Sequence, residues 1–291
     1  MYIVKSGKEY SLSVKMTDDA CCEILKPVIV IDGAERRGEI LTSDANVQIT
    51  DTDGIVIKDE IENLGGGIFK VLRSIRNDNA FDIHFKSIFE ADTIFKPNHF
   101  VFPGFNYDIS HCKGGVSAGE ILNGKTEAAE TSVINTPTGL TVNDRSWVFA
   151  YDRESIPSAS VSENEEYVFA MFVSDVNKVS LESSCSLIKN NDGTYRHRII
   201  HPISEMPYTY AHKNTFGKPM ETYFILESGK SIELSIYMIA GVPKYKYYGT
   251  ANLMEACTKI FPFRKTPELS VKKVWDIGIS YMIIFRLPCT E

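Results

Sequence analysis

The stretch ETYFILESGKSIELSIYMIAG, residues 221–241, decides the fold, because its apolar and polar residues alternate. Tyr223 and Ile225 precede a polar turn at residues 227–230, and the alternation resumes with Ile232, Leu234, Ile236 and Met238. A period of two is typical of a strand with one buried face, and a polar tetrapeptide that contains Gly is typical of a turn. The stretch therefore predicts a β-hairpin with one buried face.

Beyond Gly241 the apolar spacing changes to that of helices. Leu253, Cys257 and Ile260 recur at helical intervals before Pro262, which predicts a short helix. Residues 271–285 predict a second helix, which is apolar nearly all round from Trp275 onward. A helix of this kind needs neighbours on several sides.

The helical region suggests a division of the chain. We expect residues 1–245 to form a β domain and residues 246–291 to form the linker and first helix of a missing or truncated helical domain. An uncovered apolar helix would also join two copies of the chain into a homo-oligomer. The alternative is that the helices pack back on the β domain.

The rest of the chain before residue 240 carries strand and turn signals. A meander is predicted between residues 47 and 89, with an Asp-Gly turn at residues 51–54. Residues 167–173 are apolar on both faces, which predicts a central strand, and a hairpin is predicted around residues 190–193. The fold class is therefore mainly β: a large two-sheet antiparallel β-sandwich, or supersandwich, with a short C-terminal helical segment.

Composition narrows the classes of partner. The 291 residues are 43% hydrophobic and 11% aromatic, which is ample for a sizeable core. The net charge of −7 and the lack of a basic run argue against nucleic acid and membrane surfaces as partners. The sequence shows neither an apolar run of about 18 residues nor C-x-x-C spacing among six Cys, so a cytoplasmic protein with reduced thiols is expected.

Residues 119–126, GEILNGKT, match the phosphate-loop pattern G-x-x-x-x-G-K-[ST]. The loop needs a buried strand before it and a sustained helix after it, because the backbone amides that hold phosphate are set by that geometry. The preceding residues are polar and rich in Gly, and Pro137 follows soon after. We therefore predict that this segment binds no nucleotide.

Metal and cofactor signals are weak. His197 and His201 lie four apart on a predicted strand and so share one face, but no third ligand is evident. No dinucleotide, heme or zinc pattern occurs in the sequence. No metal site, cofactor or catalytic residue is therefore assigned.

The sequence offers one candidate binding constellation, formed by Asn106, Tyr107, Trp147, Asp152 and Arg153. Sugar sites combine flat aromatic faces with carboxylate, amide and guanidinium groups that hydrogen-bond to neighbouring hydroxyls. The alternative is that Trp147 and Tyr151 belong to the core and that Asp152 and Arg153 form an ion pair at the end of a strand.

Three short segments carry a resemblance to a known family: FPGFNY at residues 102–107, WVFAYDR at residues 147–153 and YMIAGVP at residues 237–243. With the short helix and the Trp-bearing helix that follow, they resemble the N-terminal region of bacterial glycoside-hydrolase-like proteins. In that family a galactose-mutarotase-like β-supersandwich precedes an α/α toroid, which usually carries the general acid and base. The resemblance implies a non-catalytic domain whose loops contribute to a carbohydrate site.

Two alternatives from other classes stay open. One is a free-standing carbohydrate-binding or structural module. The other is a mutarotase-like sugar epimerase that uses a carboxylate base and a His acid.

Overall fold

The computed structural model describes residues 2–5, 12–16, 19–43, 46–104, 106–107, 140–142, 145–174, 178–211, 215–246, 248–261 and 273. The chain divides into two compact units, Met1–Phe261 and Pro262–Glu291. The description that follows concerns the first unit. Apart from Lys273, the predicted helix at residues 271–285 lies outside the described residues, as does the phosphate-loop match at residues 119–126.

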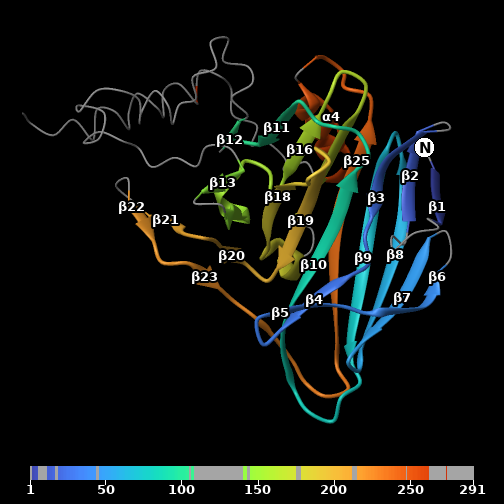
Figure 1. Cartoon of the computed structure of the whole chain (residues 1–291), viewed down its shortest axis with the longest axis vertical. Coiled ribbons are helices and arrows are strands. Elements are labelled where there is room, and N and C mark those ends of the chain that lie inside the picture. Colours follow the sequence, from blue (N-terminus) through green and yellow to red (C-terminus); the bar gives the residue numbers. More distant parts are fainter. Residues whose placement is uncertain are drawn as a thin grey trace, which may run out of the picture. The chain divides into compact units, whose positions relative to one another are not determined.

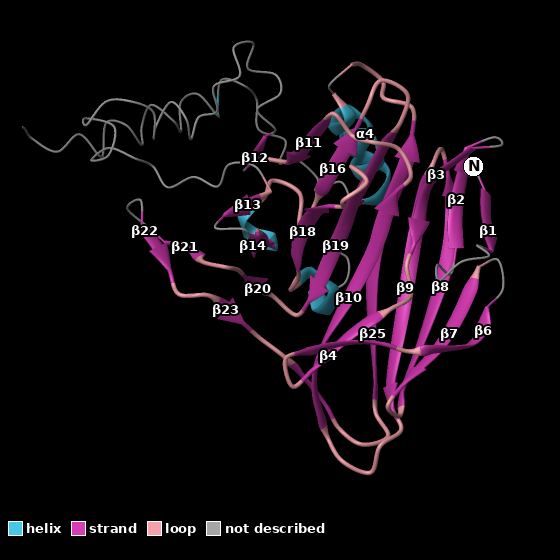
Figure 2. Ribbon diagram, in the orientation of Figure 1, coloured by secondary structure: helices cyan, strands magenta, loops and turns pink. Residues whose placement is uncertain are grey.

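One layer of the sandwich is a ten-stranded antiparallel sheet (Figures 1 and 2). Its main path runs β1-β2-β3-β10-β19-β18-β15, β4 and β24 also pair with β10, and β5 pairs with β4. The bounds are β1 Tyr2–Lys5, β2 Leu12–Met16, β3 Asp19–Ile24, β4 Val28–Ile31, β5 Ala34–Arg37, β10 Ile83–Thr93, β15 Val148–Ala150, β18 Ser184–Lys189, β19 Tyr195–His201 and β24 Phe224–Leu226.

The other layer is a nine-stranded antiparallel sheet in the order β12-β11-β16-β17-β25-β9-β8-β7-β6. Its bounds are β6 Glu39–Ser43, β7 Val47–Thr52, β8 Ile55–Gly65, β9 Ile68–Asn77, β11 His99–Phe102, β12 Asn106–Tyr107, β16 Ser160–Glu163, β17 Val168–Phe172 and β25 Ser231–Gly241. The predicted fold class, two large antiparallel sheets with a short helix near the C-terminus, is confirmed.

Shorter elements complete the described structure. Three two-stranded sheets pair β13 with β14, β20 with β23 and β21 with β22. Their bounds are β13 Thr141–Val142, β14 Arg145–Ser146, β20 Ser204–Glu205, β21 Thr209–Ala211, β22 Thr215–Gly217 and β23 Met220–Glu221. The helices are the 3-10 turn η2 Tyr151–Arg153, the short α3 Lys178–Leu181 and α4 Gly249–Ile260.

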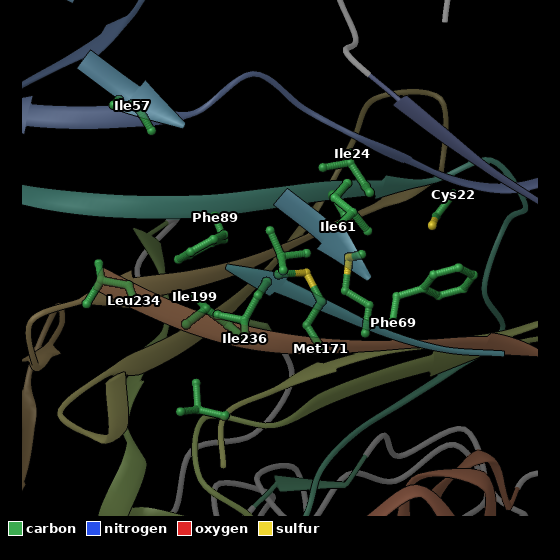
Figure 3. Packing of buried hydrophobic residues seen from close by; sticks show 14 of the residues in the cluster. Cys22, Ile24, Ile57, Ile61, Phe69, Phe89, Met171, Ile199, Leu234 and Ile236 are labelled. Carbon is green, nitrogen blue, oxygen red and sulfur yellow. The ribbon is translucent and has the colours of Figure 1, made fainter. Parts of the chain in front are cut away.

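The main core lies between the two large sheets. Each buried aliphatic or aromatic side chain there stabilises the fold by about 1.5–3 kcal/mol relative to an exposed one. Figure 3 shows side chains of both sheets meeting in this layer, among them Cys22, Ile24, Ile57, Ile61, Phe69, Phe89, Met171, Ile199, Leu234 and Ile236. The predicted central strand at residues 167–173 is confirmed as β17, which lies between β16 and β25.

The predicted hairpin in residues 221–241 is wrong. β24 pairs with β10 in the ten-stranded sheet, whereas β25 lies between β9 and β17 in the nine-stranded sheet. The inward residues of β24 are Phe224 and Leu226, and Ile225 points to solvent. The turn crosses between the sheets because Gly229 and Lys230 hydrogen-bond to Asn77 at the end of β9.

The predicted meander is correct for only part of its length. β6 to β9 are neighbours in sequence order, and the turn at Asp53 and Gly54 has the positive φ angles, 52° and 76°, of a tight hairpin. β10 instead enters the other sheet. The hairpin predicted at residues 190–193 is confirmed between β18 and β19.

The predicted short helix is confirmed as α4, which packs on the face of the nine-stranded sheet that points away from the main core. Leu253, Ala256 and Cys257 contact Phe172 and Tyr237 in a second apolar cluster. α4 therefore belongs with the sandwich, and the first compact unit continues past the expected boundary at residues 245/246 to Phe261. Among the described residues, no helix combines the length and apolar character needed to span a membrane.

Candidate functional site

Strand β10 places charged side chains on the outer face of the ten-stranded sheet. Ser87 and Phe89 point inward, where both contact Arg73 from the nine-stranded sheet. Because successive side chains of a strand point to opposite faces, Lys86, Glu90 and Asp92 point outward. Six residues separate Lys86 from Asp92, so the outward side chains extend over about 20 Å of strand.

The first group of outward residues forms an arginine row, which consists of Arg37, Arg196 and Arg198 with the carboxylates of Glu90 and Asp92. Arg196 donates Nε and Nη2 to the two oxygens of Asp92 at 2.7 and 2.8 Å. Arg198 lies opposite Glu90 in the strand register, with Nε 2.8 Å from Glu90 Oε1. Arg37 of β5 contacts the second oxygen of Glu90.

In the arginine row the carboxylates are buried, whereas the guanidinium groups that contact them are partly exposed. The Glu90 side chain is 1% exposed, whereas the Arg37 and Arg196 side chains are 38% and 28% exposed. Arg37 also lines an open groove of about 450 Å³ at the β5–β6 end of the sheets. Buried carboxylates fix the guanidinium groups, which limits the entropy that they would lose on binding a ligand.

The second group is the Tyr223 cluster, which consists of Tyr223, Lys86, Glu221 and Ser204. Lys86 Nζ lies 2.6 Å from Glu221 Oε2 and 3.3 Å from Ser204 Oγ. The same Nζ lies 4.6 Å from the centre of the Tyr223 ring, in cation–π contact. The Tyr223 hydroxyl donates to Glu221 Oε2 at 3.3 Å, and Tyr223 is 36% exposed.

The charges of the Tyr223 cluster follow from these contacts. The hydrogen bond from Lys86 lowers the pKa of Glu221. Burial, followed by the nearby Glu221 charge, raises the pKa of Tyr223. These shifts favour the carboxylate form of Glu221 and the protonated phenol of Tyr223, which are the two partly exposed groups of the cluster.

Local pairing fixes the Tyr223 cluster on the sheet. Ser204 of β20 lies opposite Glu221 of β23 in the register of the small sheet. Ser184 of β18 anchors this pair, because its Oγ donates to the Ser204 carbonyl at 2.6 Å and accepts from the Ser204 amide at 2.7 Å. The small sheet thereby joins the large one at the Tyr223 cluster.

A buried apolar patch separates the arginine row from the Tyr223 cluster. Ile88 of β10 and Ile200 of β19 lie in it together with Val28, Val30 and Val148, and Met206 packs against them. The backbone of Met206 also bridges to Val148. The outer face therefore carries two distinct polar groups.

The structure describes the residues predicted as a sugar site only in part. Asn106 and Tyr107 form β12, which pairs with β11, and their side chains lie outside the description. Trp147 is 4% exposed and stacks on Phe149 at 5.6 Å between ring centres, so it packs in a core cluster. Its buried ring offers no open stacking face in this structure, in line with the alternative interpretation.

Arg153 forms an ion pair, although its partner is not Asp152. Arg153 donates Nε and Nη2 to Glu205 at 2.5 and 3.1 Å, while Asp152 is exposed. Glu205 follows Ser204 on β20, so Arg153 is linked through one strand to the Tyr223 cluster. Arg153 is thus connected to that cluster through its ion pair with Glu205, the sequence neighbour of Ser204.

The two strand histidines are structural. His197 hydrogen-bonds to Ser160 and Ser162 at 2.8 and 2.7 Å, and His201 donates Nε2 to the Ser180 carbonyl at 2.9 Å. Burial lowers the pKa of each to about 3, so both rings are neutral at pH 7 and neither is the imidazolium that acts as a general acid. Within the described part of the chain, no three His, Cys, Asp or Glu side chains are grouped to bind a metal ion.

The described cysteines are also structural. Cys21, Cys22, Cys185 and Cys257 are buried free thiols. Burial raises the pKa of both Cys21 and Cys257 to about 12. These two thiols are therefore protonated and weakly nucleophilic at neutral pH.

The sequence contained a signal for the charged groups on the outer face of the sheet. The prediction of a sugar site from aromatic residues did not use this signal. In residues 84–93, HFKSIFEADT, charged residues stand at positions 86, 90 and 92 within an otherwise apolar run. Spacings of two and four on a strand place such residues on one face. Tyr223 was instead expected to face inward, because its strand was predicted to pair with β25.

Comparisons with known proteins find similar solved structures but no matching family. No protein-family model matches the chain, and no curated protein matches it. Among solved structures, a galactose mutarotase related enzyme from Lactobacillus acidophilus is similar at 9% identity and a TM-score of 0.41, over 81% of this chain and 91% of that one. The galactosidase domain of an alpha-galactosidase-sucrose kinase is similar at 10% identity and a TM-score of 0.36, over 76% of this chain and 28% of that one.

A GH36 alpha-galactosidase from Geobacillus stearothermophilus, solved in complex with raffinose, is similar at 10% identity and a TM-score of 0.37, over 81% of this chain and 30% of that one. The chain thus spans less than a third of the two galactosidase chains and most of the mutarotase-related one. The chain is similar to β-sandwich regions of galactose-mutarotase-like and alpha-galactosidase proteins, as its short motifs led us to expect.

Proposed function

We propose that the chain is a non-catalytic carbohydrate-binding β-sandwich domain and that the Tyr223 cluster is its main contact with the sugar. The observation that carries this proposal is the partly exposed Tyr223 ring beside the partly exposed Glu221 carboxylate, both held in place by the buried Lys86, whose Nζ lies 4.6 Å from the ring centre. C–H groups of a sugar ring stack on such an aromatic face, and sugar hydroxyls hydrogen-bond to the charged groups beside it.

The cluster is suited to binding because it is fixed before the ligand arrives. Lys86 is held from three sides, by Glu221, Ser204 and the Tyr223 ring, and Ser204 is itself held by Ser184. Preorganised groups lose little side-chain entropy on association. The arginine row and Arg153 would extend contacts to further sugar units, and Asn106, Tyr107 and Asp152 remain proposed contributors.

The test is glycan binding by the 291-residue chain. A panel of oligosaccharides would be screened on an array and the hits measured by calorimetry. Tyr223→Ala is expected to weaken binding at least about fivefold, the change that corresponds to about 1 kcal/mol. Tyr223→Phe keeps the ring and loses only the hydroxyl contact with Glu221, so it should retain most of the affinity.

Tyr245→Ala is the matched control. Tyr245 is 66% exposed and lies just before α4, on the outer side of the other sheet. Equal losses for Tyr223→Ala and Tyr245→Ala would contradict the proposed site, and no glycan bound by the parent would contradict the function. Sugar anomerisation by the pure chain above the buffer rate would favour the epimerase alternative.

A further inference from the structure

The inner face of β7 carries polar side chains that face the main core. Gln48, Thr50 and Thr52 are each at most 5% exposed, while Val47 and Ile49 of the same strand are only half-buried. Gln48 Nε2 and the hydroxyls of Thr50 and Thr52 have no hydrogen-bond partner among the residues that the structure describes. An unpaired polar group in a protein core costs about 1–3 kcal/mol, so each needs an explanation.

Gln48 differs from the two threonines because it lines a cavity. The strand register places Gln48 opposite Asp59 of β8, and Asp59 opposite Arg73 of β9. All three side chains line an enclosed space between the sheets, which has about 10 Å³ of room for the centre of a water-sized molecule. Thr50 and Thr52 are not among the lining residues.

The charges of the residues that line this cavity determine whether it can hold an ion or a neutral ligand. Arg73 donates Nε and Nη2 to the two oxygens of Asp59 at 2.7 and 2.8 Å, so the pair is already neutral overall. An added ion would be an uncompensated charge in the interior, which is strongly unfavourable. A neutral ligand needs one acceptor atom for Gln48 Nε2 and a donor for the remaining lone pairs of the Asp59 carboxylate.

We infer that Gln48, Asp59 and Arg73 form an internal hydration site that holds one ordered water molecule between the two sheets. The water accepts a hydrogen bond from Gln48 Nε2 and donates one to Asp59, which satisfies the amide and extends the ion pair across β7, β8 and β9. Most residues that line the cavity are apolar, but Gln48, Asp59 and Arg73 supply polar partners at one side of it, and a cavity of this size with two or more polar partners can hold a buried water. This site is independent of the proposed sugar contact.

Two near-isosteric substitutions give opposite predictions. Thr50→Val removes a buried unpaired hydroxyl outside the cavity, so it should leave the folding equilibrium constant unchanged or raise it. Gln48→Met removes a partner of the water, so it should lower that constant by about tenfold, as loss of one buried hydrogen-bond partner does. Both would be measured by urea unfolding of the full chain at pH 7.

A Gln48→Met variant that is as stable as the parent or more stable would show a dry cavity and overturn the inference. A crystal structure of the parent chain decides the question even if Gln48→Met does not fold. It should show one density peak within hydrogen-bond distance of Gln48 Nε2 and Asp59. Absence of the peak, or an anomalous signal there after a bromide soak, would equally overturn the inference.

Discussion

Arg73 is among the largest side chains that are fully buried between the two sheets. Its guanidinium group donates to Asp59 within its own sheet, and to Ser87 Oγ and the Ile88 carbonyl of the other sheet at 3.0 and 2.8 Å. The same group lies 3.7 Å from the centre of the Phe89 ring. One side chain thus hydrogen-bonds to both sheets across a layer that is mainly apolar.

We predict that Arg73→Met lowers the free energy of unfolding by about 3–5 kcal/mol, because Asp59 then remains buried without its partner. The double variant Arg73→Met with Asp59→Leu should recover most of that loss, since no charge is left unpaired. Urea unfolding measures both. If the double variant is as unstable as the single one, the loss comes from packing against Phe89 and not from the stranded carboxylate.

Arg76→Met serves as the control on the same strand. Arg76 also forms a bidentate pair, with Asp78 at 2.6 and 2.7 Å, but both side chains are largely exposed. Exposed ion pairs contribute little, because water and salt screen them. This variant should unfold at nearly the same urea concentration as the parent.

For single residues, the sequence shows which polar side chains interrupt an apolar strand. It does not show which residues those side chains contact. Lys86, Glu90 and Asp92 stand out in an apolar run, so an outward charged face follows from alternation alone. Trp147 is different, because an aromatic residue between Ser146 and Val148 fits a core and an open site equally well. Which one applies depends on Phe149 and the other core residues that surround it, and only the fold brings those together.

The start of α4 shows how an element depends on residues far away in sequence. Tyr248, at its N-cap, makes no side-chain capping bond, and the carboxylate of Glu163 from β16 lies against Gly249 instead. An acidic group is favourable at a helix N-terminus because of the unpaired amides and the helix dipole. Burial raises the pKa of Glu163, while His99 and the Gly249 backbone oppose that rise.

We predict that Gly249→Ala destabilises the domain, although Ala is the better helix former. A Cβ atom at this position would lie 2.7 Å from both Glu163 Oε2 and Val168 Cγ2. Overpacking costs about 1–3 kcal/mol, against a gain of up to about 1 kcal/mol in helix propensity. Thr250→Ala, one residue later and only half-buried, is the control and should shift the thermal midpoint little.

The elements themselves were predictable, but their assignment to sheets was not. Period-two patterns and Gly-containing turns located β7, β8, β17, β18 and β19, because these signals are local. The turn between β24 and β25 has the composition of a hairpin turn, yet it crosses between sheets. The cause is its pairing with Asn77, more than a hundred residues away, which no local pattern records.

At the scale of the whole molecule, His197 and His201 link stability to pH. Burial places the folded-state pKa of each near 3, below the unfolded value of about 6.5. Between these values the unfolded chain binds more protons than the folded one. The stabilising contribution is therefore complete above pH 6.5 and is lost as pH falls toward 3.

We predict that the free energy of unfolding falls between pH 6.5 and 4.5, with a contribution of up to about 1.4 kcal/mol per pH unit from each His. His197→Gln removes one of the two groups that take up a proton on unfolding. It should therefore reduce the slope of the free energy of unfolding against pH by the contribution of about one proton, whatever its effect on stability at pH 7. His201→Gln should do the same, and the two reductions should add. A slope that neither substitution changes would show that other groups cause the acid sensitivity.

The position of β25 between β9 and β17 has a consequence for synthesis on the ribosome. The edge of β9 that β25 covers is complete at Asn77, whereas β25 begins at Ser231. At about 5–20 residues per second, a nascent chain waits on the order of ten to thirty seconds before the strand that joins these two halves of the sheet emerges. Throughout that interval β9 presents an unpaired backbone edge, and β17 presents a second one once Phe172 has emerged, so chaperones that shield such edges would act on this chain before its nine-stranded sheet can close.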